Sequence, residues 1–253
     1  MRRSLSVAII TLNEEANLPR TLASIAWADQ IVVVDAGSTD DTVAAARAAG
    51  AHVFPEPWKG FAGQKNSAIS HCTGDWILSL DADEEVSAGL SAEIQTLLAG
   101  DPPWDAYNLP RSNFFLGRPL RHGGFYPDRK LRLFRRGAAR FSERAVHETL
   151  ACSGKIGQLQ NPLLHHAYPT LSTYIDHMNR YSTLAADILV QRGRRSRSFA
   201  AFLWNVVAAP RLTFFYNYVL RLGFLDGREG LLMHLYHANY TSWKYAKAWH
   251  AAK

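Results

Sequence analysis

The chain has 253 residues, of which 47% are apolar and 20% are charged, and its formal net charge is +6. This length and composition suit one large domain or one domain with an appendage, and they exclude disordered, collagen-like and disulfide-scaffold proteins. The two cysteines, Cys72 and Cys152, lie far apart in the sequence, so we expect reduced thiols and a cytoplasmic setting.

The charge is unevenly distributed along the chain. Residues 1–110 carry a net charge of −9, residues 111–144 one of +8, and residues 169–253 one of +7. The acidic part suits a metal cation, and the basic parts suit an anionic partner. The sequence contains no helix-turn-helix, zinc-finger or RNA-binding signature, so we do not expect nucleic acid as the partner. Basic residues mixed with 15 aromatic residues in 169–253 favour an anionic membrane surface instead.

Apolar, β-branched runs alternate with helical patterns in the first hundred residues. We expect strands at residues 5–12, 31–35, 51–54 and 75–84, and helices at 18–26, between Thr42 and Gly50, from 63 onward and at 85–98. This alternation predicts a parallel, doubly wound α/β sheet. Ligands of such sheets bind at the carboxyl ends of the strands, where the strand order reverses. Asp35 and Asp81 both lie at predicted carboxyl ends and can share one crevice.

The pattern changes in the second half of the chain. Residues 106–150 contain short strand-like pieces, and helical spacing begins at residue 171. Residues 199–225 are very apolar but contain Pro210 and two arginines, so we expect two helices joined near Pro210 that lie on or dip into a membrane. Residues 231–250 read as a closing amphipathic helix. We therefore divide the chain into an α/β domain, 1–168, and a helical, membrane-associating region, 169–253.

Two strand-end motifs carry candidate chemistry. In LSLDADEE, Asp81 and Asp83 are alternate carboxylates at the end of a strand. They are either a solvated acidic turn or a site for Mg²⁺ or Mn²⁺ completed by water and phosphate oxygens. In IVVVDAGSTDDT, Asp35 ends a buried strand, where its carboxylate suits hydrogen bonds from a nucleobase or ribose. The absence of GxxxxGK[ST] and of GxGxxG excludes a P-loop ATPase and argues against a nicotinamide dehydrogenase.

Four motifs in this order and spacing resemble the family 2 inverting glycosyltransferases, which have a GT-A fold: VAIITLNEEANLPRTLASI, VVVDAGSTDDT, GQKNSAI and LSLDADEE. Three later segments resemble one branch of that family, the bacterial lipopolysaccharide-core β-1,4-glucosyltransferases: PDRKLRLFRRG, VHETL and RLGFLDGREGL. The resemblance implies a Rossmann-like, mostly parallel nucleotide-sugar domain. It implies transfer of a hexose, with UDP-glucose the expected donor, to a lipid-linked or lipopolysaccharide-core acceptor at the cytoplasmic face of the inner membrane.

The resemblance also implies roles for individual residues. The nucleotide base, ribose and diphosphate of the donor would contact Thr11, Asn13, Glu14, Asp35, Lys65, Asp81 and Arg132. Asp83 would be a direct ligand of Mg²⁺ or Mn²⁺, with His165 as a second ligand. The remaining arginines of the basic run, Arg129, Arg135, Arg136 and Arg140, would bind donor or acceptor phosphates or form a solvated face.

An inverting transfer needs a carboxylate to take the proton of the acceptor hydroxyl. Much of the family uses an Asp in an ED pair, which this chain lacks in the expected region. It has Val146-His147-Glu148 there. We expect Glu148 to be the base, with Glu143 as the alternative.

Other functions fit parts of the same pattern. Related enzymes transfer sugars to polyprenyl phosphate, to a capsule or O-unit lipid, or to a protein. A nucleotidyltransferase would usually have a glycine-rich, basic first loop, whereas TLNEEANLPR is acidic. A membrane adaptor with a degenerate transferase domain is a non-enzymatic reading, against which the intact Asp35, Asp81 and Asp83 count.

Overall fold

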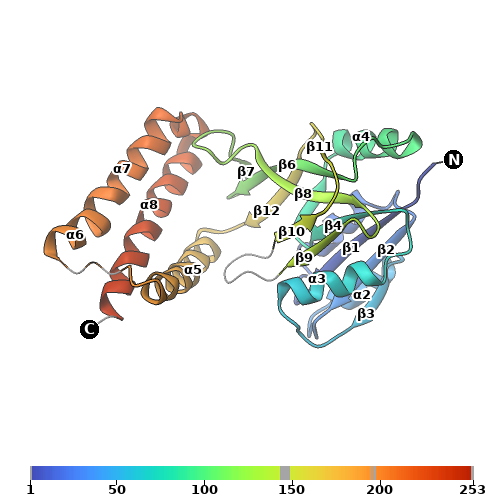
Figure 1. Ribbon diagram of the computed structural model, residues 1–253, viewed down its shortest axis with the longest axis horizontal. Helices are drawn as coiled ribbons and strands as arrows, with labels where there is room; N and C mark the ends of the chain where they lie inside the picture. Colours follow the sequence, from blue (N-terminus) through green and yellow to red (C-terminus); the bar gives the residue numbers. More distant parts are fainter. Residues whose placement is uncertain (1, 143–148, 195, 197, 252–253) are drawn as a thin grey trace. The chain divides into compact units, whose positions relative to one another are not determined.

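The computed structural model describes residues 2–142, 149–194, 196 and 198–251. These residues form two compact units (Figure 1). Unit 1 consists of the described residues within 1–111 and 128–166, and unit 2 of those within 112–127 and 167–253. The sequence suggested a single boundary after residue 168, whereas residues 112–127 group with the C-terminal part in space.

Unit 1 is built on a mixed sheet. In spatial order its strands are β3 (His52–Pro55), β2 (Gln30–Asp35), β1 (Leu5–Thr11), β4 (Trp76–Asp81), β8 (Asp128–Arg135), β6 (Ala106–Phe115), β12 (Leu163–Tyr168) and β5 (Glu84–Val86). The first four pair in parallel, and β8 is antiparallel to both of its neighbours. Three shorter strands complete the unit: β11 (Ile156–Gln158), which pairs with β6, and the hairpin of β9 (Ala139–Ser142) and β10 (Thr149–Cys152).

Helices cover both faces of the parallel strands, which is why those strands are continuous apolar runs. Side chains alternate along β1, so Val7 and Ile9 join the core on the face of α1 (Leu18–Ser24) and α4 (Ala88–Ala99). Ala8 joins the opposite core, beneath α3 (Phe61–Ser70). The fourth helix is α2 (Thr42–Ala48). The expected α/β architecture is confirmed, and its strand order reverses at β1.

Unit 2 contains three long helical segments. α5 (Leu171–Gln191) and the helix Phe199–Leu220 both pack against α8 (Gly227–His250). The middle segment is made of α6 (Phe199–Leu203), the short π-helix η1 (Trp204–Ala208), α7 (Ala209–Phe215) and the short π-helix η2 (Tyr216–Leu220). The unit also holds β7 (Arg118–Pro119) and the 3₁₀ turn η3 (Gly223–Asp226).

The expectation of two helices joined near Pro210 is wrong, because the helix runs through this residue. Proline lacks an N–H and its ring crowds the carbonyl four residues earlier, which here belongs to Val206. Val206 lies in the short π-helix η1, where the backbone is wider, and its carbonyl accepts a hydrogen bond of 2.8 Å from Ser242 Oγ of α8. A side chain of the neighbouring helix thus satisfies the acceptor that proline leaves open.

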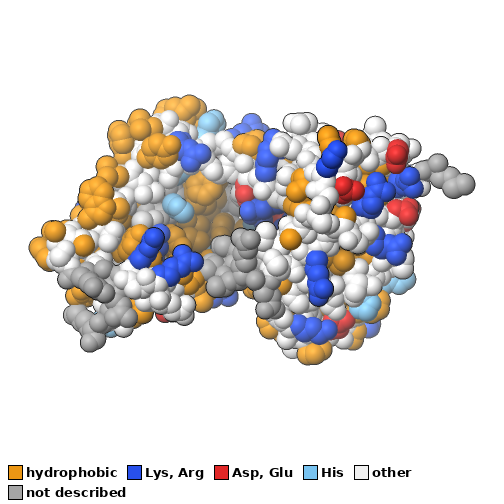
Figure 2. Space-filling view, viewed as in Figure 1, with side chains coloured by type: hydrophobic (Ala, Val, Ile, Leu, Met, Phe, Trp, Pro, Cys, Tyr) orange, Lys and Arg blue, Asp and Glu red, His pale blue; other side chains and the backbone are white. Residues whose placement is uncertain are grey.

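The helix Phe199–Leu220 leaves most of its apolar surface uncovered. It is 22 residues long with a mean hydropathy of 1.2, and only 6% of its most apolar stretch is buried. This length and composition are enough to cross a membrane. Figure 2 shows apolar side chains gathered along this helix, and those exposed by half or more include Phe199, Trp204, Leu212, Phe215, Tyr216 and Leu220.

Candidate active site

Three polar side chains meet where the parallel strands end. The register pairs Thr11 of β1 with Asp35 of β2, and Ile10 of β1 with Asp81 of β4. Thr11 and Asp35 are 3% and 2% exposed, and the carboxylate of Asp81 is 29% exposed. This edge lies at the reversal of strand order, where ligands of open α/β sheets bind. Thr11, Asp35 and Asp81 therefore lie at the same edge of the sheet, where the sequence predicted that Asp35 and Asp81 would meet.

Asp35 holds the loop that follows β2. Its Oδ1 accepts hydrogen bonds from the backbone N–H groups of Gly37 (3.0 Å) and Ser38 (2.9 Å). Its Oδ2 accepts from the hydroxyls of Thr11 (3.1 Å) and Ser38. Burial would raise the pKa of Asp35, but these hydrogen bonds outweigh burial and lower it. All four lone pairs of the carboxylate are used, so a direct contact with a ligand needs one of these donors to be displaced.

The loop after β1 is fastened to the loop after β2. The Asn13 N–H donates to Ser38 Oγ (2.8 Å), and Asn13 Oδ1 accepts from the Thr39 N–H (2.9 Å). The Glu14 N–H donates to Thr42 Oγ1 (2.7 Å). Asn13 has a φ of 56°, a left-handed conformation in which Asn is enriched. Asn13 and Glu14 are therefore held next to the ends of β1 and β2.

Negative charge gathers beside this loop. Burial raises the pKa of Glu14, and the carboxylates of Asp83, Asp40 and Asp81 raise it further, whereas a hydrogen bond from Asn17 opposes the rise. The carboxylates of Asp83, Asp40 and Asp81 thus add negative charge around Glu14. Such a site favours the arrival of a cation.

Asp81 lies between two buried cations. Lys65 Nζ of α3 is 2.7 Å from its Oδ1, and Arg132 Nη2 of β8 is 2.5 Å from its Oδ2. Both basic residues are 5% exposed. Burial would raise the pKa of Asp81, but Arg132 and Lys65 hold it well below its ordinary range. The sequence therefore predicted three residues of one cluster without indicating that they are ion-paired to each other.

The same cluster includes residues that the sequence analysis missed. Glu84 is fully buried, and its Oε1 is 2.7 Å from Arg132 Nη2 and 3.3 Å from Arg111 Nη1. Its Oε2 accepts the Asp81 N–H at 3.0 Å, and Arg111 also binds Asp128 at 2.7 Å. Three buried or mostly buried cations and three carboxylates are thus joined in one network, and the exposed Lys130 adds a contact of 3.0 Å to Asp128 at its edge. The pattern of β5, in which Glu84 and Val86 share a buried face, is the signal that could have identified Glu84.

Asp83 meets His165 across the sheet. His165 lies on β12 opposite Glu84 of β5, and its Nε2 is 3.4 Å from Asp83 Oδ2. His166 points to the other face of the strand, where its Nε2 contacts Glu85 Oε2 at 2.9 Å. Burial lowers the pKa of His166. Of the two histidines, His165 is therefore the one beside Asp83.

A carboxylate and an imidazole form a donor set that suits Mn²⁺ or Mg²⁺ with further oxygen ligands. In the part of the chain that the structure describes, no group of three His, Cys, Asp or Glu side chains is arranged to hold a metal. Asp83 and His165 can therefore supply two ligands, and a bound molecule and water would supply the rest.

The expected catalytic base lies in a part of the chain that the structure does not describe. Glu148, Glu143 and His147 lie outside the described residues. Asn66 of the QKN segment clamps β9, because its side chain exchanges two hydrogen bonds with the backbone of Phe141 (2.8 and 2.9 Å).

The arginines of β8 separate along the strand. β8 is antiparallel to β4, and the register pairs Arg135 with Trp76 at the amino end of β4. Arg132 reaches the carboxyl end instead, where it binds Asp81. Only Arg132 of this run therefore joins the cluster of Asp81.

Comparisons with known proteins find glycosyltransferases similar to this chain. A model of the family described as glycosyl transferase family 2 matches residues 6–142. Over 230 residues the chain is 34% identical to the lipopolysaccharide core biosynthesis glycosyltransferase LpsC of Rhizobium meliloti, covering 88% of this chain and 82% of that protein. It is 33% identical over 210 residues to an uncharacterized glycosyltransferase of Rickettsia typhi, covering 78% of this chain and 72% of that protein.

The fold is also seen in a solved structure of another protein. It is a mannosyltransferase of Pyrobaculum calidifontis in complex with GDP-mannose and Mn²⁺, with a TM-score of 0.57 and 16% identity. The alignment covers 98% of this chain and 87% of that one. At this level of identity the likeness concerns the fold alone.

Proposed function

The chain belongs to glycosyltransferase family 2, and from this premise we propose that it transfers a hexose, glucose in the first instance, from a UDP-sugar to a lipid-linked saccharide of the lipopolysaccharide core. Its α/β unit has the GT-A fold expected for a nucleotide-sugar enzyme. The observation that carries the proposal is the pairing of Asp83 with His165 beside the Lys65–Asp81–Arg132 cluster. The naming of a related protein for lipopolysaccharide core biosynthesis supports the acceptor.

The donor would bind with its nucleotide over the ends of β1 and β2. Asn13 and Glu14 are held there by the loop after β2, which Asp35 and Thr11 stabilise. In this arrangement Asp35 positions the loop that would hold the nucleotide. A direct hydrogen bond from the uracil or ribose to Asp35 would require the hydroxyl of Thr11 or Ser38 to give up its own hydrogen bond.

The diphosphate would lie toward Asp83. A divalent cation, Mg²⁺ or Mn²⁺, held by Asp83 and His165 would neutralise the charge that develops on the leaving nucleoside diphosphate. Lys65 and Arg132 add fixed positive charge on either side of Asp81. Because all three are held by the surrounding network, they need little reorganisation when the donor binds. The structurally related mannosyltransferase, which was solved with GDP-mannose and Mn²⁺, is consistent with a cation at such a site.

The transfer itself would be a single in-line displacement with inversion. The acceptor oxygen forms a bond to the anomeric carbon as the bond to the diphosphate breaks, and a carboxylate takes the hydroxyl proton. We assign this base to Glu148, with Glu143 as the alternative. Positioning of the two substrates supplies much of the rate acceleration, and no covalent intermediate is required.

The exposed helix Phe199–Leu220 would bring the enzyme to its acceptor. Its apolar face is uncovered, and basic side chains border it: Arg192 and Arg194 precede the helix, and Arg221 follows it. Apolar surface bordered by cations suits the anionic cytoplasmic leaflet of the inner membrane. A lipid-linked saccharide is presented at such a surface.

The direct test measures release of the nucleoside diphosphate by detergent-solubilised protein. We would supply UDP-, GDP- and ADP-sugars with Mg²⁺ or Mn²⁺, with and without truncated core lipid. We expect turnover with a UDP-sugar that requires metal and increases with core lipid. Asp83→Asn and His165→Gln should each lower kcat/KM by about 100-fold, because each removes one metal ligand.

The matched control is Asp101→Asn, which removes an 82% exposed carboxylate paired with Arg3 at the amino end of β1, away from Asp83 and His165, and should leave kcat/KM unchanged. Full metal-dependent turnover in Asp83→Asn would refute the assigned metal site. Stimulation by polyprenyl phosphate in place of core lipid would refute the acceptor, and tight vesicle binding without turnover of any donor would identify a membrane adaptor.

A further inference from the structure

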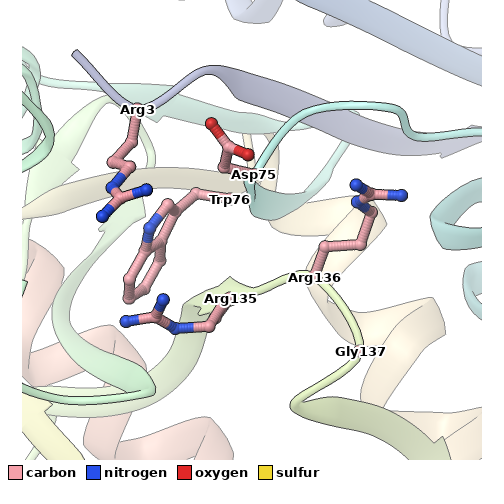
Figure 3. A pocket seen from close by; sticks show the side chains of 6 residues that line it. All are labelled: Arg3, Asp75, Trp76, Arg135, Arg136 and Gly137. Atoms are coloured by element: carbon pink, nitrogen blue, oxygen red, sulfur yellow. The ribbon is translucent and has the colours of Figure 1, made fainter. Parts of the chain in front are cut away.

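A second polar hollow lies at the opposite end of β4 from the candidate active site. It has a volume of about 410 Å³ and is lined by Arg3, Asp75, Trp76, Arg135, Arg136 and Gly137 (Figure 3). β4 runs from Trp76 to Asp81, which at 3.3 Å per residue places Trp76 at the hollow roughly 16 Å from Asp81 at the candidate active site. The hollow is therefore distinct from the donor site.

Two buried N–H groups at this hollow lack an acceptor. Trp76 is fully buried, and its indole Nε1 makes no hydrogen bond in the described part of the protein. The same is true of Nε of Arg135, which lies 3.9 Å from the nearest carboxylate oxygen, that of Asp105. That distance is too long for a hydrogen bond. Buried polar groups are nearly always paired, so two unpaired donors at one hollow indicate a missing acceptor.

The charges around these donors favour an anion. Three arginines line the hollow against the single carboxylate of Asp75. That carboxylate is occupied by Ser4, whose N–H and hydroxyl both donate to Asp75 Oδ2 at 3.0 Å. In Figure 3 the guanidinium groups of Arg3 and Arg135 flank the Trp76 indole, and Arg135 lies 5.5 Å from the ring centroid.

The arginines differ in how strongly they are already neutralised. Arg3 pairs at 3.1 Å with Asp101, whose side chain is 82% exposed, so water and salt screen this contact. Among the described residues Arg136 makes no ion pair, and its backbone N–H donates to the Asp75 carbonyl at 2.9 Å, which holds the residue at the hollow. Arg136 is thus the arginine of the hollow without a close contact to any described carboxylate, although the charge of Asp75 acts on it from a greater distance.

We propose that this hollow is a second anion site that binds a phosphate group through Arg3, Arg135, Arg136 and the Trp76 indole N–H. A phosphate oxygen supplies the acceptor that the two buried donors lack, and guanidinium groups bind phosphate through paired, charge-assisted hydrogen bonds. The ligand is a phosphate-bearing small molecule, either inorganic phosphate or a phosphorylated sugar. The proposal does not depend on the proposed transferase activity.

The indole N–H of Trp76 offers a local readout. Protein labelled with ¹⁵N-tryptophan gives one indole cross-peak for each of its 7 tryptophans, and the Trp76 peak is assigned by its loss in Trp76→Phe. Inorganic phosphate and glucose 6-phosphate would be titrated separately with EDTA present, with sodium chloride at matched ionic strength as the reference. We expect a saturable shift of the Trp76 peak with phosphate and none with chloride. Tighter saturation by glucose 6-phosphate would identify a phosphorylated sugar as the natural ligand.

Two variants test the assigned cations. Arg136→Gln should weaken phosphate binding about tenfold or more, since it removes a charge-assisted contact. Arg47→Gln removes an exposed arginine of α2 that does not line the hollow, so it should leave the binding curve unchanged. The proposal is overturned if the Trp76 peak follows ionic strength alone, or if Arg136→Gln binds phosphate as tightly as the unaltered protein. Vesicles of phosphatidylglycerol that shift the peak when soluble phosphates do not would also overturn it.

Discussion

Replacing Glu84 by Gln tests whether the buried network beside the candidate active site stabilises unit 1. Glu84 is fully buried, accepts hydrogen bonds from two guanidinium groups through Oε1, and accepts the Asp81 N–H through Oε2. Glutamine has nearly the same shape but only one oxygen. In either orientation its NH₂ group faces a donor, and the network is left with one uncompensated positive charge.

The size of the effect follows from burial. Removing one partner of a buried ion pair costs about 3–5 kcal/mol in the free energy of unfolding, because the remaining charges stay in a low-dielectric site. For a protein of this size each kcal/mol shifts the melting temperature by about 2–4 °C. Glu84→Gln should therefore lower the Tm by about 6–20 °C.

Urea unfolding followed by circular dichroism, together with calorimetry at pH 7, measures both quantities. Glu15→Gln is the matched control, since Glu15 is exposed and accepts a single hydrogen bond from the Asp41 N–H. It should change the free energy of unfolding by less than about 1 kcal/mol. In Glu84→Gln combined with Arg111→Gln, the charges balance again, so the combined loss should be smaller than the sum of the two single losses. A Glu84→Gln protein within about 1 kcal/mol of the unaltered one would refute the reasoning.

Two further predictions concern unit 2. Burial lowers the pKa of His234 to about 4, so the unfolded chain binds more protons between pH 6.5 and 4. The free energy of unfolding should therefore fall by about 2 kcal/mol from pH 7 to pH 5, and His234→Gln should remove that part of the slope in urea titrations. An unchanged slope would contradict this assignment. The double variant Leu212→Asn, Leu220→Asn should weaken binding to phosphatidylglycerol vesicles, measured by flotation, at least about tenfold. The reason is that two exposed apolar side chains that would insert into lipid are replaced by polar ones. Leu184→Asn, which replaces an exposed residue of α5, is the control. An equal loss of vesicle binding in the control and in the double variant would argue against a specific membrane face.

Local patterns in the sequence were sufficient for the strands and for the residues at their ends. The apolar runs of β1, β2 and β4 are buried on both faces, which is a property of parallel sheets covered by helices. Once the strands are parallel, the polar residues that follow them must meet at one edge. Asp35 and Asp81 could therefore be assigned to one edge of the sheet from the chain alone.

The tertiary structure decided which of those residues bind each other. Asp83 and His165 are 82 positions apart, and they meet because β12 pairs with β5. Glu84 looks like part of an exposed acidic turn in the sequence, yet the pairing of β5 buries it against Arg111 and Arg132. No local pattern contains these contacts, because they depend on the order in which distant strands are placed in the sheet.

The same reason explains where the arginines of the basic run lie and why the predicted break at Pro210 is absent. Arg132 and Arg136 are close in the chain, but the extended strand β8 and its register with β4 place them at opposite ends of β4. Pro210 predicts a break, but Ser242 of α8 satisfies the carbonyl of Val206, and the helix continues. Local chemistry specifies which conformations and charges a segment brings, whereas partners distant in the chain determine whether a charge is buried, where it points and whether a proline interrupts a helix.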